Sequence, residues 1–325
     1  MLDEKIKVAR LSIMSNTILT AGKLAAGMAM GSMAVISEAI HSGVDLLASV
    51  IAFLSVRESG KPADDVHRFG HGKFENLAAI IEALLIVSAA GVIVWQAVPM
   101  LFAPGEVHVL GLGLAVMGVS AAVNFYVSAR LFDVARRTDS PALEADGWHL
   151  RTDVYTSLGI FAGLIAIKLT GLTILDPIIA LMVTVLILKS AYKLLRESIR
   201  NILDVRLSDE EEGIIRGIIH RHAGDFVNFH QLRTRKSGPY RYIDLHLVVP
   251  GRSTVFDAHD LCRRIEQSLK ESIPGVEIII KTEPCNPANG DCNRCTLHIK
   301  LSGRLNPPSA GQCVDCVQCR RQEGE

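Results

Sequence analysis

The sequence predicts a multi-span α-helical membrane protein with six transmembrane helices, followed by a small cytoplasmic α+β domain of αββαβ, ferredoxin-like order. The composition is the first reason: 49% of the 325 residues are hydrophobic and the mean hydropathy is +0.29, which is unusual for a soluble chain. The second reason is a change of pattern after about Leu203, where long apolar stretches give way to short helix and strand patterns. The 34 basic and 34 acidic residues balance. The composition therefore gives no sign of the excess of basic residues that is typical of nucleic-acid-binding proteins.

Six segments are long and apolar enough to cross a bilayer, whose hydrocarbon core requires about 20 predominantly apolar residues. They are Leu11–Ser32, Ala34–Val56, Leu77–Val98, Val109–Leu131, Leu143–Leu169 and Thr173–Leu195. Aromatic residues make up only 5% of the chain, so we expect these helices to pack closely through small residues. The opening MLDEKIKVARLS has no A-x-A cleavage site and is interpreted as a retained cytoplasmic segment, not a signal peptide.

Basic residues predict the orientation of the spans. They gather before span one, after spans two and four, and at the exit of span six: Lys5, Lys7, Arg10, Arg57, Lys61, Arg68, Lys73, Arg136, Arg137, Lys193, Arg196 and Arg200. The opposite connections, near Gly31–Met33, Met100–His108 and Thr170–Thr173, contain no Lys or Arg. This asymmetry predicts a multi-pass protein of the cell inner (plasma) membrane, embedded in the lipid bilayer, with cytoplasmic N- and C-termini.

Three regions follow from these patterns: a transmembrane domain at 1–203, a cytoplasmic domain at 204–284, and a Cys-rich tail at 285–325. The expected cytoplasmic elements are a helix at Ser208–His222, strands at Phe229–Arg235 and Tyr240–Val249, a helix at Phe256–Ile273 and a strand at Val276–Lys281. Ser208 precedes an acidic first turn, which favours it as the helix N-cap. The αββαβ order predicts two helices on one face of a sheet.

Two matching His/Asp pairs lie inside the predicted spans. Span two holds His41 and Asp45, and span five holds His149 and Asp153. Residues at i and i+4 share one face of a helix, so each pair can direct two ligands to a common point. Two such helices would supply two imidazole nitrogens and two carboxylate oxygens, a set that suits tetrahedral Zn²⁺. The alternative for either pair is an ordinary hydrogen bond within its helix.

The charge of this predicted site indicates what it could do. An Asp in the middle of a membrane helix costs about 2.5–3.5 kcal/mol on insertion scales. Either Zn²⁺ or two protons would neutralise two such carboxylates, and imidazole, with a reference pKa of about 6.5, must be neutral to bind metal. The site therefore has the chemistry of an exchanger of metal for protons. Glu38 and Glu82 also lie in predicted spans, and we expect them to pair or to line a passage.

The paired motifs, the six spans and the stretch FGHGKFENLAA after span two resemble the cation diffusion facilitator (CDF) family, most closely its bacterial YiiP-like zinc exporters. The resemblance covers about residues 5–284. It implies a homodimer, proton-coupled efflux, a cytoplasmic domain that binds further metal, and a transport site at the four residues of the two pairs. In the family, His at the position of His41 goes with zinc selectivity, whereas Asp there admits Cd²⁺ or other ions.

The resemblance also implies two metal sites outside the spans. One falls on Asp64, His67 and His71, for which the alternative is a solvated polar loop. The other falls on His230, His246 and His259. The family ends this domain with His-x-Asp-Pro, whereas this chain has Lys281-Thr282-Glu283-Pro284. Because a protonated Lys cannot bind a metal, we expect one metal on the three His and Glu283 in place of a two-metal centre.

The tail contains six of the seven cysteines: Cys285, Cys292, Cys295, Cys313, Cys316 and Cys319. The spacing of four of them, Cys292-x₂-Cys295-x₁₇-Cys313-x₂-Cys316, fits the zinc-ribbon template, and a cytosolic compartment would keep the thiols reduced. The closing C-x₂-C-x₂-C is also similar to an iron–sulfur run, although it lacks the fourth Cys and the Pro of that pattern. Zinc binding, an iron–sulfur cluster and a passive tail remain alternatives.

Taken together, these features predict a divalent metal efflux transporter, a Zn²⁺/H⁺ antiporter that works by alternating access. Zn²⁺ would be both the transported ion and a regulatory or structural one. The alternatives are efflux of Fe²⁺, Mn²⁺ or Cd²⁺ by the same fold, and a non-transporting metal sensor or scaffold. An intramembrane zinc hydrolase is disfavoured. Catalytic zinc usually has three protein ligands and an open position, whereas the predicted site has four protein ligands, and the chain contains no H-E-x-x-H. We therefore expect no enzymatic activity.

Overall fold

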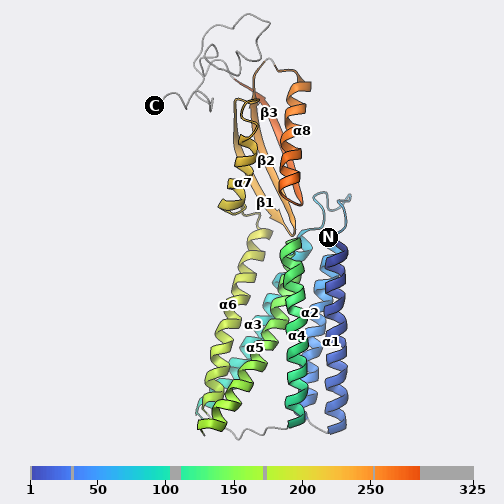
Figure 1. Cartoon of the computed structure of the whole chain (residues 1–325), viewed down its shortest axis with the longest axis vertical. Coiled ribbons are helices and arrows are strands. Elements are labelled where there is room, and N and C mark those ends of the chain that lie inside the picture. The colour runs from blue at the N-terminus through green and yellow to red at the C-terminus, as the bar shows by residue number, and fades with distance from the viewer. Residues whose placement is uncertain (1, 31–32, 103–110, 171–173, 252, 286–325) are drawn as a thin grey trace, which may run out of the picture. The chain divides into compact units, whose positions relative to one another are not determined.

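The computed structural model describes residues 2–30, 33–102, 111–170, 174–251 and 253–285 (Figure 1). The chain divides into two compact units, Met1–Leu203 and Asp204–Glu325. Within the described residues, the first unit consists of long helices and the second combines two helices with a three-stranded sheet.

Six helices of 27 to 30 residues form the first unit: α1 (Leu2–Met30), α2 (Met33–Ser59), α3 (Lys73–Phe102), α4 (Gly111–Thr138), α5 (Pro141–Thr170) and α6 (Leu175–Ile202). At about 1.5 Å rise per residue each is longer than the roughly 30 Å hydrocarbon core. The segment before span one, expected to be cytoplasmic, forms the first turns of α1. Judged by length and apolar composition, two stretches of the described helices could span a membrane, Lys73–Phe102 and Pro177–Ile202.

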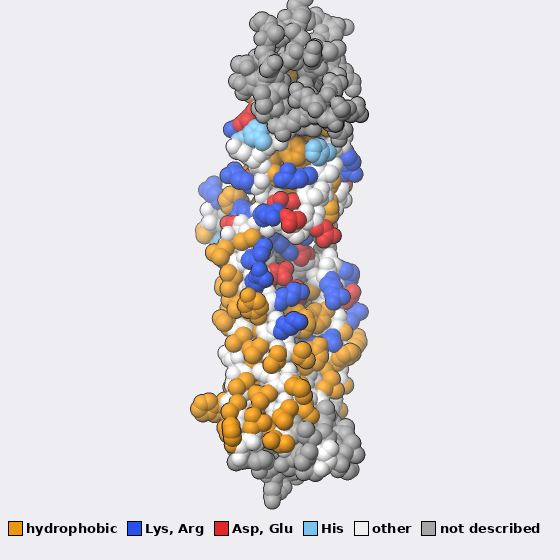
Figure 2. Space-filling view, turned by 90° about the vertical axis from the view of Figure 1, so that its left-hand side faces the viewer, with side chains coloured by type: hydrophobic (Ala, Val, Ile, Leu, Met, Phe, Trp, Pro, Cys, Tyr) orange, Lys and Arg blue, Asp and Glu red, His pale blue; other side chains and the backbone are white. Residues whose placement is uncertain are grey.

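Small side chains hold the helices of this unit together. The helices pack mainly in three pairs, α1 with α2, α3 with α6, and α4 with α5. Fully buried alanines such as Ala52, Ala83 and Ala145 lie at the contacts, and their size lets the backbones approach closely. Large apolar side chains, among them Trp95 and Val185, are exposed instead. In Figure 2 hydrophobic side chains cover most of the lower part of the view, where the helical unit lies. A surface of this kind suits contact with lipid.

A buried ion pair joins the helix ends at one end of this unit. Lys5 Nζ of α1 donates to Glu75 Oε1 of α3 at 2.8 Å. Ser59, at the end of α2, donates to the same oxygen at 2.6 Å, and Ser140, just before α5, donates to Oε2. All four residues are buried. One carboxylate therefore links the ends of four helices, and its charge has a fixed partner.

The second unit has the expected αββαβ order. Its elements are α7 (Asp209–His220), β1 (Asn228–Ser237), β2 (Tyr240–Val249), α8 (Val255–Ser272) and β3 (Val276–Pro284). The sheet order is β1-β2-β3, with β1 antiparallel and β3 parallel to β2. The predicted N-cap is confirmed, since the Ser208 hydroxyl accepts from the Glu211 N–H at 3.2 Å in a capping box. Thr254 and Asp257 form a second capping box at α8.

Both helices of this unit cover the same face of the sheet, as the element order predicts. Alternate residues of β2, Ile243, Leu245 and Leu247, belong to one core cluster with Ile219 of α7 and Ile265 of α8. The period of two places the even-numbered residues of β2 on the opposite face. That uncovered face carries the His and Glu side chains discussed below.

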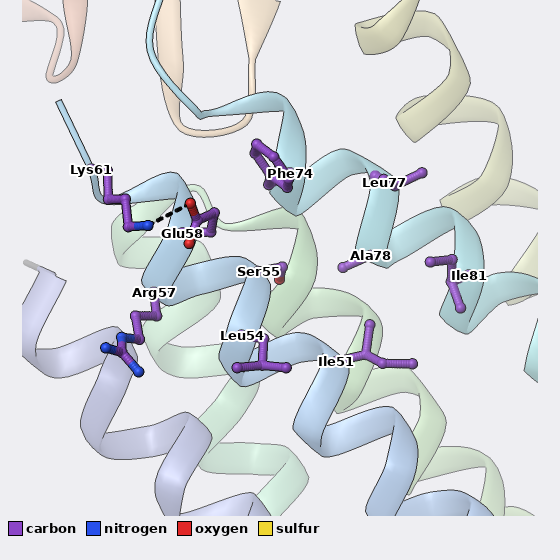
Figure 3. A pocket seen from close by; sticks show the side chains of 10 residues that line it. All are labelled: Ile51, Leu54, Ser55, Arg57, Glu58, Lys61, Phe74, Leu77, Ala78 and Ile81. Carbon is purple, nitrogen blue, oxygen red and sulfur yellow. Dashed lines mark hydrogen bonds and ion pairs between the residues drawn. The ribbon is translucent and has the colours of Figure 1, made fainter. Parts of the chain in front are cut away.

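A surface cavity of about 600 Å³ lies between α2 and α3 (Figure 3). Apolar side chains from both helices, including Leu54, Phe74 and Ile81, line it. Charged side chains lie at one end, where Lys61 Nζ donates to Glu58 Oε1 at 2.6 Å. None of the metal ligands predicted from the sequence lines this cavity, so it is separate from the candidate metal centres.

The Lys5–Glu75 pair gives a test of the fold. Replacing either partner alone, by Lys5→Met or Glu75→Gln, leaves the other charge buried and unpaired, which costs about 3–5 kcal/mol. We expect each single variant to lower the free energy of unfolding by about that amount, and the double variant to recover part of the loss. Unfolding in detergent micelles measures this, with the exposed Lys7→Met as control. Equal stability of Lys5→Met and Lys7→Met would contradict the ion pair.

Candidate metal centres

The first centre lies inside the helical unit, where Asp45 of α2 meets His149 and Asp153 of α5. One ligand atom of each residue lies within 4.8 Å of the other two. His149 Nε2 is 3.1 Å from Asp45 Oδ1. Asp45 and His149 are only 5% and 4% exposed. In the part of the chain that the structure describes, His149 Nδ1 has no hydrogen-bond partner, although buried polar atoms are normally paired.

Helix geometry explains why these residues converge. The i, i+4 spacing places His149 and Asp153 on one face of α5, and α2 presents Asp45 to that face. Asn124 Nδ2 of α4 donates to Asp153 Oδ2 at 3.4 Å, so a third helix orients the carboxylate. His41 lies one turn before Asp45 in α2, on the same helical face; its side chain lies outside the described residues.

A chain of buried polar groups continues from this centre. Asp146, one turn before His149, accepts from Ser49 Oγ at 3.0 Å. Asn16 Nδ2 of α1 donates to the same hydroxyl at 2.7 Å. Nearby in the sequence of α2, Ser42 Oγ accepts from the buried Lys23 Nζ at 2.7 Å. The sequence does not mark these residues as members of a site, because isolated polar residues in apolar helices show no ligand spacing and only their burial distinguishes them.

The second centre lies in the connection between α2 and α3. His71 Nε2 is 3.3 Å from Asp64 Oδ2, and His67 Nδ1 is 3.6 Å from Asp64 Oδ1. The N–H of His67 donates to Asp64 Oδ1 at 2.6 Å, and this bond holds the pKa of the Asp64 carboxyl below its usual value. His71 is 4% exposed, whereas Asp64 and His67 are open to solvent. The three predicted side chains thus form a cluster with one buried and two accessible members.

The third centre lies on the uncovered face of the sheet, where His230, His246 and Glu283 meet. His230 of β1 is directly opposite His246 of β2. Glu283 of β3 contacts both: Oε1 is 3.0 Å from His246 Nδ1, and Oε2 is 3.4 Å from His230 Nε2. The strands therefore bring together two nitrogens and a carboxylate that are far apart in the sequence.

Lys281 lies beside this third centre. Its Nζ donates to Glu283 Oε1 at 2.8 Å, and this bond lowers the pKa of the Glu283 carboxyl. Because His246 contacts the same oxygen, the ammonium group competes with any metal for it. The basic side chain at position 281 thus affects the centre directly, as a neighbour of its carboxylate.

Two further predicted ligands that the structure describes, His259 and Cys285, lie outside the three clusters. His259 is exposed on α8, which packs on the other face of the sheet, so it is not part of the His230–His246–Glu283 cluster. Cys285 is a free cysteine directly after β3, and its N–H donates to Val249 O at 2.8 Å. The other predicted tail ligands, Cys292, Cys295, Cys313, Cys316 and Cys319, lie outside the described residues.

Comparison with known proteins places the two units in one family. Residues 9–203 match the model of the cation efflux transmembrane domain. Residues 207–285 match the model of the cytoplasmic domain of cation efflux proteins. The matched ranges cover all residues of the three clusters.

Individual relatives agree with this. An uncharacterized transporter, sll1263, of Synechocystis sp. is 36% identical over 262 residues, which are 81% of this chain and 84% of the relative. The cation-efflux pump FieF of Serratia proteamaculans is 34% identical over 270 residues, 83% of this chain and 89% of the relative. A solved structure of a putative zinc transporter, CzrB in its Zn form, is 36% identical; the match covers 25% of this chain and 92% of that chain, with a TM-score of 0.24.

The family matches span both units, and the matches to sll1263 and FieF cover more than two thirds of the chain. The resemblance noted from the His/Asp pairs and the FGHGKFENLAA stretch is thereby confirmed. The chain belongs to the cation diffusion facilitators, the family of cation efflux membrane transporters.

Proposed function

We propose that this protein exports Zn²⁺ in exchange for protons by alternating access, with a transport site at His41, Asp45, His149 and Asp153. The buried convergence of Asp45, His149 and Asp153 carries the proposal. One nitrogen and two oxygens within 4.8 Å of one another match the donors and approximate size of a zinc site. His41, on the same face of α2 as Asp45, would complete a tetrahedral set.

The donor set favours zinc over other divalent ions. Two imidazoles and two carboxylates suit tetrahedral Zn²⁺, whereas Mn²⁺ prefers more oxygen ligands and octahedral geometry. Imidazole is a borderline ligand that binds several transition metals, so geometry and ligand number must provide the selectivity. On this proposal the residue at position 41 decides between zinc and larger ions such as Cd²⁺.

Charge balance supports antiport. Asp45 is buried in a helix of the transmembrane domain and Asp153 lies one turn from buried His149, where a carboxylate costs about 2.5–3.5 kcal/mol on insertion scales. Zn²⁺ neutralises both carboxylates, and so do two protons. Each ion therefore stabilises the site that the other leaves, which couples their movements in opposite directions.

The arrangement in the membrane is also part of the proposal. Six helices of spanning length, with basic residues at the start of α1 and α3 and the ends of α2, α4 and α6, favour six spans with both termini in the cytoplasm of the inner membrane. The match of the second unit to the family's cytoplasmic domain favours a homodimer in which this domain participates.

The two other clusters would hold zinc that is not transported. The second offers two imidazoles and the Asp64 carboxylate, and its exposure suits exchange with solvent. The third offers His230, His246 and Glu283, a three-ligand set for one metal. Because the Lys281 ammonium occupies one Glu283 oxygen, metal must displace it, and this suits a regulatory site with moderate affinity.

The transport site is tested with Asp153→Asn. The amide removes a charged ligand. Loss of a group that only supports a ligand lowers metal affinity or activity by roughly 10–100-fold, so we expect a larger fall in Zn²⁺ flux when the ligand itself is lost. The flux is measured in proteoliposomes under an imposed pH gradient. The control is Asp133→Asn, which alters an exposed carboxylate that pairs with Arg137 on α4. Absent flux in the wild type, or undiminished flux in Asp153→Asn, would favour the sensor or scaffold function.

Ion selectivity is tested with His41→Asp. A carboxylate can bind through both oxygens, so this change can give a larger ion more than four ligand atoms, and we expect the ratio of Cd²⁺ to Zn²⁺ transport to rise. Competition between the two ions in the same vesicles measures that ratio. An unchanged ratio would show that position 41 does not determine selectivity.

The third centre is tested by the amount of zinc bound to the full-length chain at buffered free Zn²⁺. Glu283→Gln should remove one bound ion, because it eliminates the charged ligand. Lys281→Met should shift binding to lower free Zn²⁺, because it frees Glu283 Oε1. The control is Glu277→Gln, on the same strand and exposed. If Lys281→Met binds more weakly than the wild type, the ammonium does not compete with the metal.

A further inference from the structure

Glu82 is a buried carboxyl group without a partner in the helical unit. It lies in α3 and is 0% exposed. Within the described residues neither of its carboxyl oxygens has a hydrogen-bond partner. An isolated carboxylate in a low-dielectric interior is strongly disfavoured, and such groups are normally neutralised. The environment therefore favours the protonated form of this side chain.

A second buried carboxyl group, that of Asp146, lies in α5 near the contact of this helix with α3. Asp146 is also 0% exposed and acts on Glu82 as a like charge. The adjacent residues Ala83 and Ala145 pack in one cluster, which holds α3 and α5 close together at this level. Asp146 Oδ1 accepts from Ser49, whereas Oδ2 has no partner among the described residues. Two buried carboxyls next to each other cannot both remain ionised without a cation.

Within the described residues, the groups that act on the pair are hydroxyl and titratable side chains. Hydroxyl groups of α1 and α2, those of Ser12 and Ser49, act on Asp146 as hydrogen-bond donors. Besides Glu82, titratable groups that act on Asp146 include His149 of α5 and Asp45 of α2. In the described part of the chain no Lys or Arg forms an ion pair with either carboxyl. Protons are thus the simplest means of neutralising the pair.

Helix positions place the pair on one side of the metal cluster. Asp146 lies one turn before His149 on α5, toward the helix end at Ser140. Glu82 lies seven residues after Glu75 on α3, about 10 Å along the axis. The pair is therefore between the Asp45–His149–Asp153 cluster and the end of the unit where Glu75 binds Lys5. That end is cytoplasmic in the proposed orientation.

We propose that Glu82 and Asp146 form a proton-holding site that passes protons from the transport site toward the cytoplasm. The inference rests on the proposed Zn²⁺/H⁺ exchange and adds the route of the proton. When Zn²⁺ enters the transport site, a proton leaves an imidazole or carboxyl there and a carboxylate of the pair accepts it. The O–H bond formed later breaks as the proton passes to water at the cytoplasmic end. No other bond changes.

Glu75 provides a matched control on the same helix. Like Glu82 it is 0% exposed, but its carboxylate is bound to Lys5 Nζ at 2.8 Å and to the hydroxyls of Ser59 and Ser140. These donors stabilise the ionised form. Glu75 thus has the donors that Glu82 lacks, although both are buried glutamates of α3.

Infrared spectroscopy of the full-length protein in lipid nanodiscs tests the protonation directly. We expect the wild type at neutral pH to show the C=O stretching band of a buried carboxylic acid. Glu82→Gln should lose intensity in this band, and Glu75→Gln should retain it. Asp146→Asn, as a second variant, should alter the band of the remaining Glu82. A wild type without the band, or a Glu82→Gln protein that keeps it in full, would overturn the proposal.

Transport kinetics test the role in coupling. Glu82→Gln should lower the maximal rate of Zn²⁺ flux and change its dependence on cytoplasmic-side pH, while the Zn²⁺ concentration at half-maximal rate stays unchanged. A variant that only disturbs packing would lose stability but would not change the rate and its pH dependence while leaving the half-maximal Zn²⁺ concentration unchanged. The thermal unfolding of each variant is therefore measured as well. Wild-type rate and pH profile in Glu82→Gln would refute the proton route. Absence of Zn²⁺ flux in the wild type would instead refute the proposed antiport, while the infrared band still decides whether the pair holds a proton.

Discussion

The need to neutralise buried charge governs the helical unit of this protein. A carboxylate away from water must have a bound cation, an ion-pair partner, strong donors or a proton. The structure contains a permanent solution at Glu75, which is bound to Lys5 and two serines. At Asp45, His149 and Asp153 it instead brings carboxylates to an imidazole, where a mobile cation can complete the balance. In the proposed function, a fixed partner marks a structural carboxylate and an exchangeable partner marks a carboxylate of the transport site.

The packing of the helices serves this arrangement. Buried alanines let α2, α3 and α5 approach closely, so polar side chains from different helices can meet inside the unit. Large apolar side chains cover the outside, as the face in Figure 2 shows.

Local patterns predicted much of the fold and part of the sites. The i, i+4 spacing of His149 and Asp153 correctly predicted that they share one face of α5, and Ser208 before an acidic turn correctly predicted the start of α7.

Long-range pairing could not be predicted in the same way. Lys5 and Glu75 are 70 residues apart, and nothing in either segment indicates the other. His259 was grouped with His230 and His246 by resemblance, but α8 covers the opposite face of the sheet, a fact that depends on tertiary packing. Glu82 was visible as a charged residue in an apolar span, whereas its approach to Asp146 depends on how α3 and α5 pack.

The central claim is that a single buried site exchanges Zn²⁺ for protons. The most direct measurement is simultaneous recording of Zn²⁺ flux and internal pH in proteoliposomes of the wild-type protein, with and without a protonophore that collapses the pH gradient. The account predicts that Zn²⁺ movement is accompanied by proton movement in the opposite direction, and that uphill Zn²⁺ accumulation disappears when the gradient is collapsed. Zn²⁺ accumulation against its gradient that persists unchanged without a pH gradient would contradict it.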